Sequence, residues 1–316
     1  MIITVTPNPS IDQIYWVERL NQRTTALLTR ADRTQTSAGG KGVNVSVLLN
    51  RLGVETSAMG FIAGYKGHTL EDLLHAQKIT TNFVWTDGES RTNAVIVERG
   101  QETQPIEVNA LGPTISQNAL SRFMKRYDNA LRRSDCLMCG GSLPPGLGDD
   151  FYGDLLQAAH EKKIKTILYT SDVPFDRACQ QGPWMVKPDM RERTEVLGKV
   201  VQTREEAYRA GRDLLKTGSQ IVIMAHELTR PVASQLVITN EGTWDFGARS
   251  ATLKNRVGAG DAFVAGMFYK LQRGRSVAEA GRFGMAASIA ASESSTIVAS
   301  RSDIERALKR VVEETL

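Results

Sequence analysis

Residues 256–261 combine a turn that suits an anion with a group that could move a proton. The segment reads Arg256-Val-Gly-Ala-Gly-Asp261 and is followed at once by an amphipathic stretch, 262–273. Small residues before a helix leave backbone N–H groups free, and the helix dipole adds positive potential there. A carboxylate suits this place if it takes a proton from the group that attacks the anion. Asp is also a common helix N-cap, so the motif alone leaves both roles open for Asp261.

A second glycine-rich turn, Ala38-Gly-Gly-Lys-Gly-Val-Asn44, opens another stretch with a helical pattern. Glycines and a lysine at a helix start favour close backbone approach to a polar or phosphorylated ligand. Two familiar motifs are absent: the chain has no G-x-x-x-x-G-K-[ST], and its first strand leads into Pro7-Asn-Pro-Ser-Ile-Asp12 rather than G-x-G-x-x-G. This argues against a Walker-type phosphate loop and against a dinucleotide dehydrogenase.

A third turn, Gly140–Gly146, follows an apolar strand at the end where open α/β sheets bind ligands. The alternative is that this segment has no functional role and is only a rigid turn. The three cysteines are too few for a disulfide framework. Cys136 and Cys139 have metal-like spacing but lie in one apolar run, which favours two buried strand residues. The four histidines are scattered without ligand spacing.

The elements that must position these turns alternate along the chain. Runs rich in apolar or β-branched residues predict strands at Ile2–Thr6, Thr56–Ile62, Ser134–Cys139, Thr166–Tyr169, Pro183–Lys187 and Gln220–Ala225. Amphipathic periodicity predicts helices at Gly42–Leu52, His68–Lys78, Phe151–Lys163, Thr203–Lys216, Asp261–Arg273 and Val277–Ser292. This alternation predicts an α/β fold with a mostly parallel central sheet.

Two segments interrupt the alternation. Residues 11–36 hold no convincing helix, and residues 91–108 read as a hairpin of Asn93–Glu98 and Thr103–Val108. We expect these segments to pair into a small separate sheet that covers a cleft. The chain is therefore predicted to be one domain, residues 1–316, with lid segments at about 11–37 and 88–110.

Composition excludes several classes of protein. The 316 residues are 41% hydrophobic and 23% charged, which is ordinary for a soluble globular chain. The net charge of +4 is spread thinly, so we expect no nucleic-acid partner. There is no run of about 18 apolar residues that would span a membrane. The first residues lack a basic region and Pro7 and Pro9 follow, so a cytoplasmic protein is expected.

Taken together and in order, these motifs resemble the PfkB/ribokinase family of sugar kinases. Within it they resemble the branch of 1-phosphofructokinases and tagatose-6-phosphate kinases. The matching pieces cover nearly the whole chain: 6–12, 39–44, 91–93, 141–146, 187–188 and 258–261. The resemblance implies a three-layer α/β sandwich with a β-sheet lid. It also implies ATP as co-substrate and Mg²⁺ as cofactor.

The resemblance further implies roles for single residues. Asp261 would be the catalytic base, with Gly258, Ala259 and Gly260 as the anion hole. Sugar-phosphate binding would fall to Asp12, Arg30, Gly39, Gly40, Lys41, Asn44, Arg91, Asn93 and Ser142. Among these, Arg30, Lys41 and Arg91 are candidates for the substrate's phosphate. Nucleotide binding would involve Lys187, Asp189 and His226, and Glu192 would place Mg²⁺ through water.

Several residues depart from the family pattern on the nucleotide side. Tyr169 stands where the family usually has Asp, and Asp189 replaces the Asn of its N-x-x-E motif. Ala225 and Leu228 stand at glycine positions, and Arg256 replaces a usual Thr. These changes predict weak ATP affinity and a relaxed preference for the base.

The resulting prediction is ATP-dependent phosphorylation of a ketohexose monophosphate. Fructose 1-phosphate is the expected substrate and tagatose 6-phosphate the nearest alternative, since each has a phosphate at one end and a primary hydroxyl at the other. A sugar-phosphate-binding homologue with impaired catalysis is the alternative from another class. An exposed edge of the lid could also pair with its copy to form a homodimer.

Overall fold

The centre of the molecule is an 11-stranded sheet, seen in a computed structural model that describes residues 1–20, 28–191, 194–254, 256–294 and 299–316. Its strands follow the order β17-β16-β15-β14-β11-β10-β9-β1-β4-β5, with β6 also paired to β4. Their bounds are β1 (Ile2–Thr6), β4 (Thr56–Ile62), β5 (Thr80–Thr81), β6 (Val84–Trp85), β9 (Cys136–Gly140), β10 (Lys165–Tyr169), β11 (Met185–Val186), β14 (Ile221–His226), β15 (Ser234–Ile238), β16 (Thr243–Ala248) and β17 (Val311–Thr315).

The sheet is parallel from β5 through β14 and antiparallel from β14 to the β17 edge. Strands β1, β4 and β9 are buried along their whole length, because both faces of the sheet are covered by helices. In β1, Ile2 packs into the core on one face while Ile3 and Val5 pack into the core on the other. The predicted α/β class with a mostly parallel sheet is therefore confirmed.

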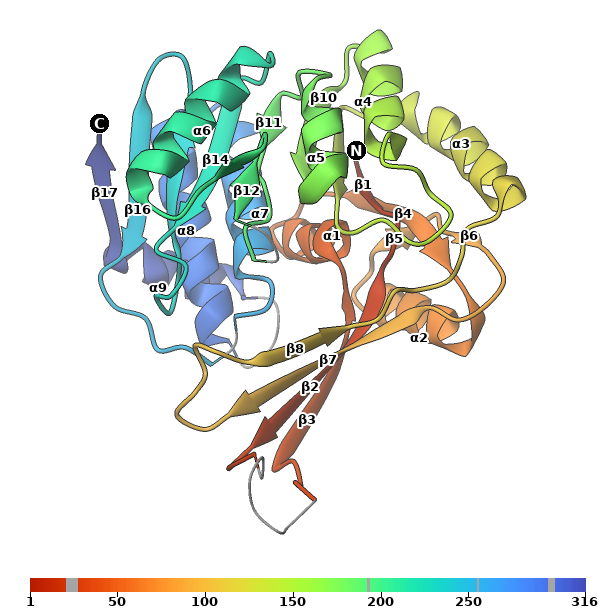
Figure 1. Cartoon of the computed structure of the whole chain (residues 1–316), viewed down its shortest axis with the longest axis horizontal. Helices are drawn as coiled ribbons and strands as arrows, with labels where there is room; N and C mark the ends of the chain where they lie inside the picture. Colours follow the sequence, from red (N-terminus) through yellow and green to blue (C-terminus); the bar gives the residue numbers. More distant parts are fainter. Residues whose placement is uncertain (21–27, 192–193, 255, 295–298) are drawn as a thin grey trace.

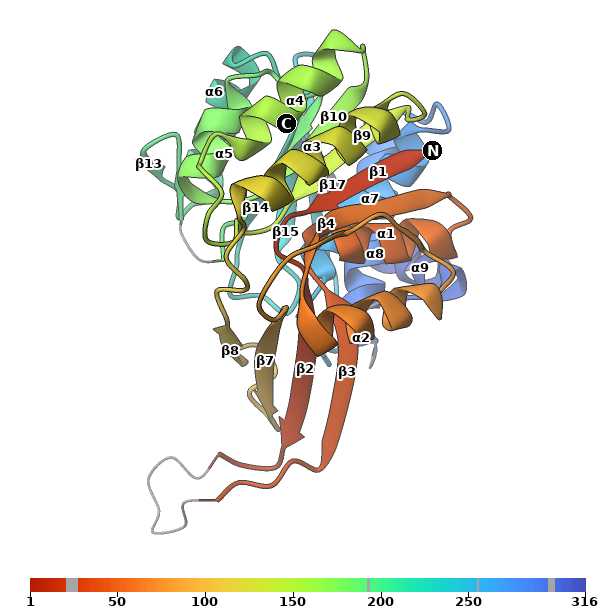
Figure 2. The same ribbon diagram turned by 90° about the vertical axis from the view of Figure 1, so that its right-hand side faces the viewer.

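Helices cover the two faces as separate layers (Figure 2). One core is formed with α3 (Gln117–Leu131), α4 (Phe151–Glu161), α5 (Asp172–Cys179) and α6 (Arg204–Lys216). The other is formed with α1 (Lys41–Arg51), α7 (Ala259–Leu271), α8 (Val277–Glu293) and α9 (Arg301–Ala307), and the short 3-10 helix η1 (Leu308–Arg310) follows α9. Helix α2 (Gly64–His75) packs with α1 and β4 in a smaller cluster.

The lid is a separate four-stranded sheet that projects from the body below the main sheet (Figure 1). Its order is β3-β2-β7-β8, formed by β2 (Ser10–Val17), β3 (Arg33–Gly39), β7 (Arg91–Glu98) and β8 (Ile106–Asn109). The predicted small sheet is thus confirmed. Strand β8 starts three residues later than expected; Pro105, which has no N–H to donate, precedes it.

Several elements are absent from the predicted set. Helix α3 is one, although Ala119, Phe123, Tyr127 and Leu131 recur every fourth residue and are all buried. Ser116 caps this helix by accepting from the Ala119 N–H at 3.2 Å. Also unpredicted are α5, α9, the antiparallel strands β15, β16 and β17, and the small hairpin of β12 (Glu195–Val196) and β13 (Lys199–Val200).

All three cysteines are buried, as expected for strand and core residues. Cys136 and Cys139 lie in β9, and they face the two different cores. Since they point to opposite faces of one strand, they cannot share a metal or form a disulfide. Within the described ranges, no helix is long and apolar enough to cross a membrane.

Candidate active site

Two adjoining cavities lie where the lid meets the carboxyl ends of the central strands. The lid-side cavity is small, about 80 Å³, and is lined by Asp12, Lys41, Asn44, Arg91, Asn93 and Ser142 among others. The outer cavity is about 620 Å³, and its walls include Tyr169, Lys187, Ala225, Leu228, Gln235 and Arg256. The residues that line both are Glu107, Asn109, Asp189, Arg191, Gly258 and Asp261. These six residues therefore mark the junction between the two cavities.

Asp261 lies at this junction, in the first turn of α7. The N-cap residue of the helix is Gly258, in the left-handed region with φ 82°, so Asp261 does not serve as the N-cap. Its side chain is buried, and its Oδ2 accepts a hydrogen bond from Asn44 Nδ2 at 2.7 Å. Asn44 comes from α1, so this hydrogen bond brings the two glycine-rich turns together.

The residues predicted as an anion hole line the outer cavity beside Asp261. At Gly260, an added Cβ would lie 2.4 Å from the Tyr169 hydroxyl oxygen. A side chain therefore does not fit at this position. The free N–H groups of a helix's first turn, together with its dipole, form a site for negative charge.

Asp12 is the polar anchor of the lid-side cavity. Its Oδ1 accepts from Ser10 Oγ at 2.7 Å and from Asn93 Nδ2 at 3.0 Å. Burial raises the pKa of Asp12, while these two hydrogen bonds act in the opposite direction. Gly39 packs directly against this side chain, since an added Cβ would lie 2.1 Å from Asp12 Oδ2.

A cluster of charges joins the two cavities. Asp189 Oδ2 lies 2.5 Å from Lys41 Nζ and 2.9 Å from Arg191 Nη2. Burial alone would raise the pKa of Asp189, but Arg191 and Lys41 hold it well below its usual range. The Tyr169 ring lies under two cations, with Lys41 Nζ at 4.1 Å and Lys187 Nζ at 5.0 Å from its centroid. Burial lowers the pKa of Lys187 to about 8.

This cluster connects two of the departures noted in the sequence. Tyr169 and Asp189 lie on neighbouring segments, since the Asp189 N–H donates to the Thr170 carbonyl at 2.8 Å. Arg191 was not predicted as a site residue. The available signal was its place two residues after a candidate carboxylate, which says little without the fold.

The remaining predicted sugar-side residues divide into two groups. Gly40 and Ser142 line the lid-side cavity, and so does Arg91, whose Nη1 donates to the Ala110 carbonyl at 3.2 Å. Arg30 is exposed, in the segment between β2 and β3, and is not among the described residues that line either cavity. Its predicted contact with the substrate phosphate is not supported by this arrangement.

On the nucleotide side, strand alternation separates Ala225 from His226. Ala225 lines the outer cavity, whereas His226 is on the opposite face of β14 and its Nε2 lies 2.9 Å from Asp245 Oδ1. His226 is therefore removed from the predicted site. Gln235 of β15, paired with Ala225, also lines the cavity, and its buried Oε1 has no hydrogen-bond partner within the described part of the chain. Glu192, the predicted metal residue, lies outside the described residues.

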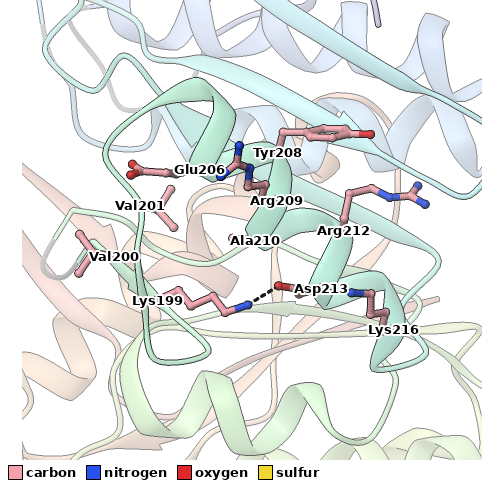
Figure 3. Close-up of a pocket in the computed structure, with 10 residues that line it drawn as sticks. All are labelled: Lys199, Val200, Val201, Glu206, Tyr208, Arg209, Ala210, Arg212, Asp213 and Lys216. Atoms are coloured by element: carbon pink, nitrogen blue, oxygen red, sulfur yellow. Dashed lines mark hydrogen bonds and ion pairs between the residues drawn. The ribbon is translucent and has the colours of Figure 1, made fainter.

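A third cavity, of about 470 Å³, lies away from this junction between β13 and α6 (Figure 3). Its charges are satisfied locally: Asp213 pairs with Lys199 and with Lys216, each at 2.6 Å. None of the predicted site residues lines it, and we assign it no role.

Comparison with known proteins identifies the protein family to which a chain with this fold and site belongs. The sequence model described as "pfkB family carbohydrate kinase" matches residues 6–303. The chain belongs to this family of carbohydrate kinases.

Individual relatives are similar over most of their length. A 1-phosphofructokinase of Bacillus subtilis is 33% identical over 90% of each chain. A tagatose-6-phosphate kinase of Staphylococcus epidermidis is 30% identical over 84% of each. A crystal structure titled "Possible 1-phosphofructokinase" from Thermotoga maritima superposes with a TM-score of 0.90 at 29% identity, over 100% of this chain and 99% of that one.

Proposed function

We propose that this kinase transfers the γ-phosphoryl group of ATP to the primary hydroxyl of a ketohexose monophosphate, with fructose 1-phosphate as the preferred acceptor. The observation that carries the proposal is the position of Asp261 between the two cavities, held by Asn44 at 2.7 Å. The sugar phosphate would occupy the lid-side cavity and the nucleotide the outer one.

In the proposed reaction Asp261 takes the proton of the attacking hydroxyl. The oxygen forms a bond to the γ-phosphorus, the bond from that phosphorus to ADP breaks, and fructose 1,6-bisphosphate results. The N–H groups at Gly258, Ala259 and Gly260 hold the negative charge that develops, which is the main contribution a protein makes in phosphoryl transfer. Asp12, Asn44 and Asn93 would orient the sugar hydroxyls.

Cations at the cavity junction fit the two phosphate groups. Lys41 and Arg91 line the lid-side cavity and would hold the substrate's own phosphate. Lys187 and Arg191 line the outer cavity and would hold the transferring group. Each is a permanent or titratable cation facing a space that would receive a polyanion.

Mg²⁺ is the cofactor that the family resemblance implies. The described residues hold no group of three or more His, Cys, Asp or Glu that could bind a metal by themselves. Mg²⁺ usually needs one or two carboxylates besides substrate phosphates and water. Asp189 at the junction, and Glu192 as the resemblance implies, would supply them. When bound with ATP, Mg²⁺ neutralises phosphate charge.

A coupled ADP-release assay over a panel of sugar phosphates tests the proposal. Fructose 1-phosphate should give the highest kcat/KM, with tagatose 6-phosphate as the closest competitor. A higher value for tagatose 6-phosphate would move the assignment to that activity. Binding of sugar phosphate without ADP release from any acceptor would favour a catalytically impaired homologue.

Self-association through the lid is part of the proposal. Ile106 and Val108 of β8, and Leu111 just after it, are large apolar side chains with 38%, 60% and 79% exposure. A second copy could cover this surface, because apolar edge strands are ready sites for pairing. Sedimentation equilibrium would show the dimer.

A further inference from the structure

The segment before the catalytic turn is attached to the lid at Val257. This side chain is 8% exposed and packs with Ile14, Val95 and Val97 in a buried apolar cluster. Those three residues belong to lid strands β2 and β7, so the main body contributes Val257 to the core of the lid. The next residue, Gly258, is the N-cap of α7. Val257 therefore connects the core of the lid to the proposed anion hole.

Arg256 makes a second attachment, to the outer cavity. Its Nη1 donates to the Thr103 carbonyl at 2.7 Å, in the connection between β7 and β8. Its Nη2 donates to the carbonyls of Leu228 and, at 2.7 Å, Arg230, in the loop after β14. One planar guanidinium thus joins the β7–β8 connection of the lid to a loop of the main body.

Both joined segments form walls of the outer cavity. The lid connection contributes Thr103, Gln104 and Pro105, and the loop after β14 contributes Leu228, Pro231 and Val232. Arg256 lines the cavity between them. The lid, which covers the lid-side cavity, is consequently also part of the wall of the outer cavity.

We propose that Arg256 and Val257 form a latch that couples sugar-phosphate binding under the lid to nucleotide binding and to the geometry of the anion hole. Both are positioning residues, because they act through the lid and through Gly258 rather than on the reacting atoms. A ligand that holds the lid closed would order the wall of the second cavity in advance. The second ligand then binds more tightly, and the same factor applies in reverse. The inference rests on the proposed assignment of the two cavities.

Calorimetric titration of a non-hydrolysable ATP analogue with Mg²⁺, with and without saturating fructose 1-phosphate, measures this coupling. We expect a factor in the usual range of about 5–150 for the wild type. In Arg256→Ala the factor should fall to within twofold of one; because Arg256 lines the outer cavity, the readout is the ratio of the two affinities and not the affinity for the analogue alone. Arg256→Lys keeps the charge but has a single nitrogen in place of the two that reach the lid and the loop after β14, so its coupling should also be largely lost. Arg99→Ala removes an exposed lid ion pair with Glu18 and should keep full coupling.

Amide hydrogen exchange gives a readout that does not depend on the substrate assignment. Arg256→Ala should speed exchange in residues 99–105 and 228–231 and leave that of β1 unchanged. Val257→Ala, which loses apolar contact with the lid, should do the same in β2 and β7. Unchanged exchange in Arg256→Ala would overturn the latch. So would a coupling factor in Arg256→Ala that equals the wild-type factor. If the wild type binds no sugar phosphate, the functional proposal fails, while the exchange result still decides whether the latch exists.

Discussion

Asp261 occupies the first turn of α7 without capping it. Its two possible roles, helix N-cap and catalytic base, can therefore be told apart by experiment. Because Gly258 is the cap, Asp261→Asn should have little effect on the helix start. The variant loses the proton acceptor, so we expect turnover to fall roughly 10²–10⁴-fold with sugar-phosphate affinity nearly unchanged. Steady-state kinetics and calorimetry measure the two quantities. Near-normal turnover would show that Asp261 is not the base.

Arg91 and Arg30 provide a test residue and its control for binding of the substrate phosphate. Arg91 lines the lid-side cavity, whereas Arg30 is exposed outside it. Arg91→Ala should therefore raise KM for a sugar phosphate far more than for the free sugar, since a guanidinium suits phosphate. Arg30→Ala is the control and should change neither. Equal effects of Arg91→Ala on both substrates would mean that it does not bind the phosphate.

The lowered pKa of Lys187 predicts that nucleotide binding depends on pH. Burial lowers its pKa to about 8 from a usual 10.5, so the free enzyme loses this positive charge as the pH rises through about 8. The KM for ATP should rise over the same range. The folded state binds fewer protons than the unfolded state between these two pKa values, so this group makes stability increase with pH there. Lys187→Arg keeps its charge and should flatten the KM profile; an unchanged slope would exclude Lys187 as the titrating group.

Some site residues could be predicted from sequence because backbone chemistry dictates them. Gly39 and Gly260 face neighbours that leave no room for a Cβ, and Asp261 follows a turn that leaves N–H groups free. Arg191 could not be predicted in this way. Its role depends on Asp189 and on two cavities that meet only in the folded chain. Likewise, His226 looked equivalent to Ala225 until strand alternation placed them on opposite faces.

Helices α7 and α8 pack closely through small residues, and this packing supports the glycine-rich turn at residues 258–260. At Gly284 an added Cβ would lie 2.7 Å from the Phe263 carbonyl oxygen. Gly284→Ala should therefore destabilise the protein by about 1–3 kcal/mol, as overpacking usually does. Gly153 in α4 has open space around its Cβ position, so Gly153→Ala should instead stabilise by about 0.5–1 kcal/mol. Denaturant unfolding compares them; equal shifts would argue against the close helix contact.

Helices and strands could be predicted from the sequence where a single hydrophobic pattern dominated the segment. The central strands are buried on both faces and read as continuous apolar runs, whereas β15, β16 and β17 at the edge were not singled out. Helix α3 carries a clear four-residue period that could have been found. The parallel pairing of β2 with β7 joins segments about 80 residues apart, and local sequence does not specify such a pairing.

At the scale of the whole molecule, we expect the residues of the outer cavity to determine how well ATP is used. Ala225 and Leu228 line the outer cavity, as do Tyr169 and Asp189. We expect an ATP KM near or above about 1 mM, the upper end of the common range, and a relaxed preference for the base. Titrating ATP and GTP with Mg²⁺ by calorimetry tests both. Tight and adenine-selective binding would show that other residues, with Gln235 the first candidate, have rebuilt the site.

The buried cysteines give the folded molecule a chemical property of its own. Cys136, Cys139 and Cys179 are all hidden within the two cores, and burial raises the pKa of each thiol. A maleimide therefore finds neither access nor thiolate on the native protein. Labelling would report only molecules whose central layers have separated. The chain thus carries a built-in probe of global opening, one that local motion of the distant lid should not trigger.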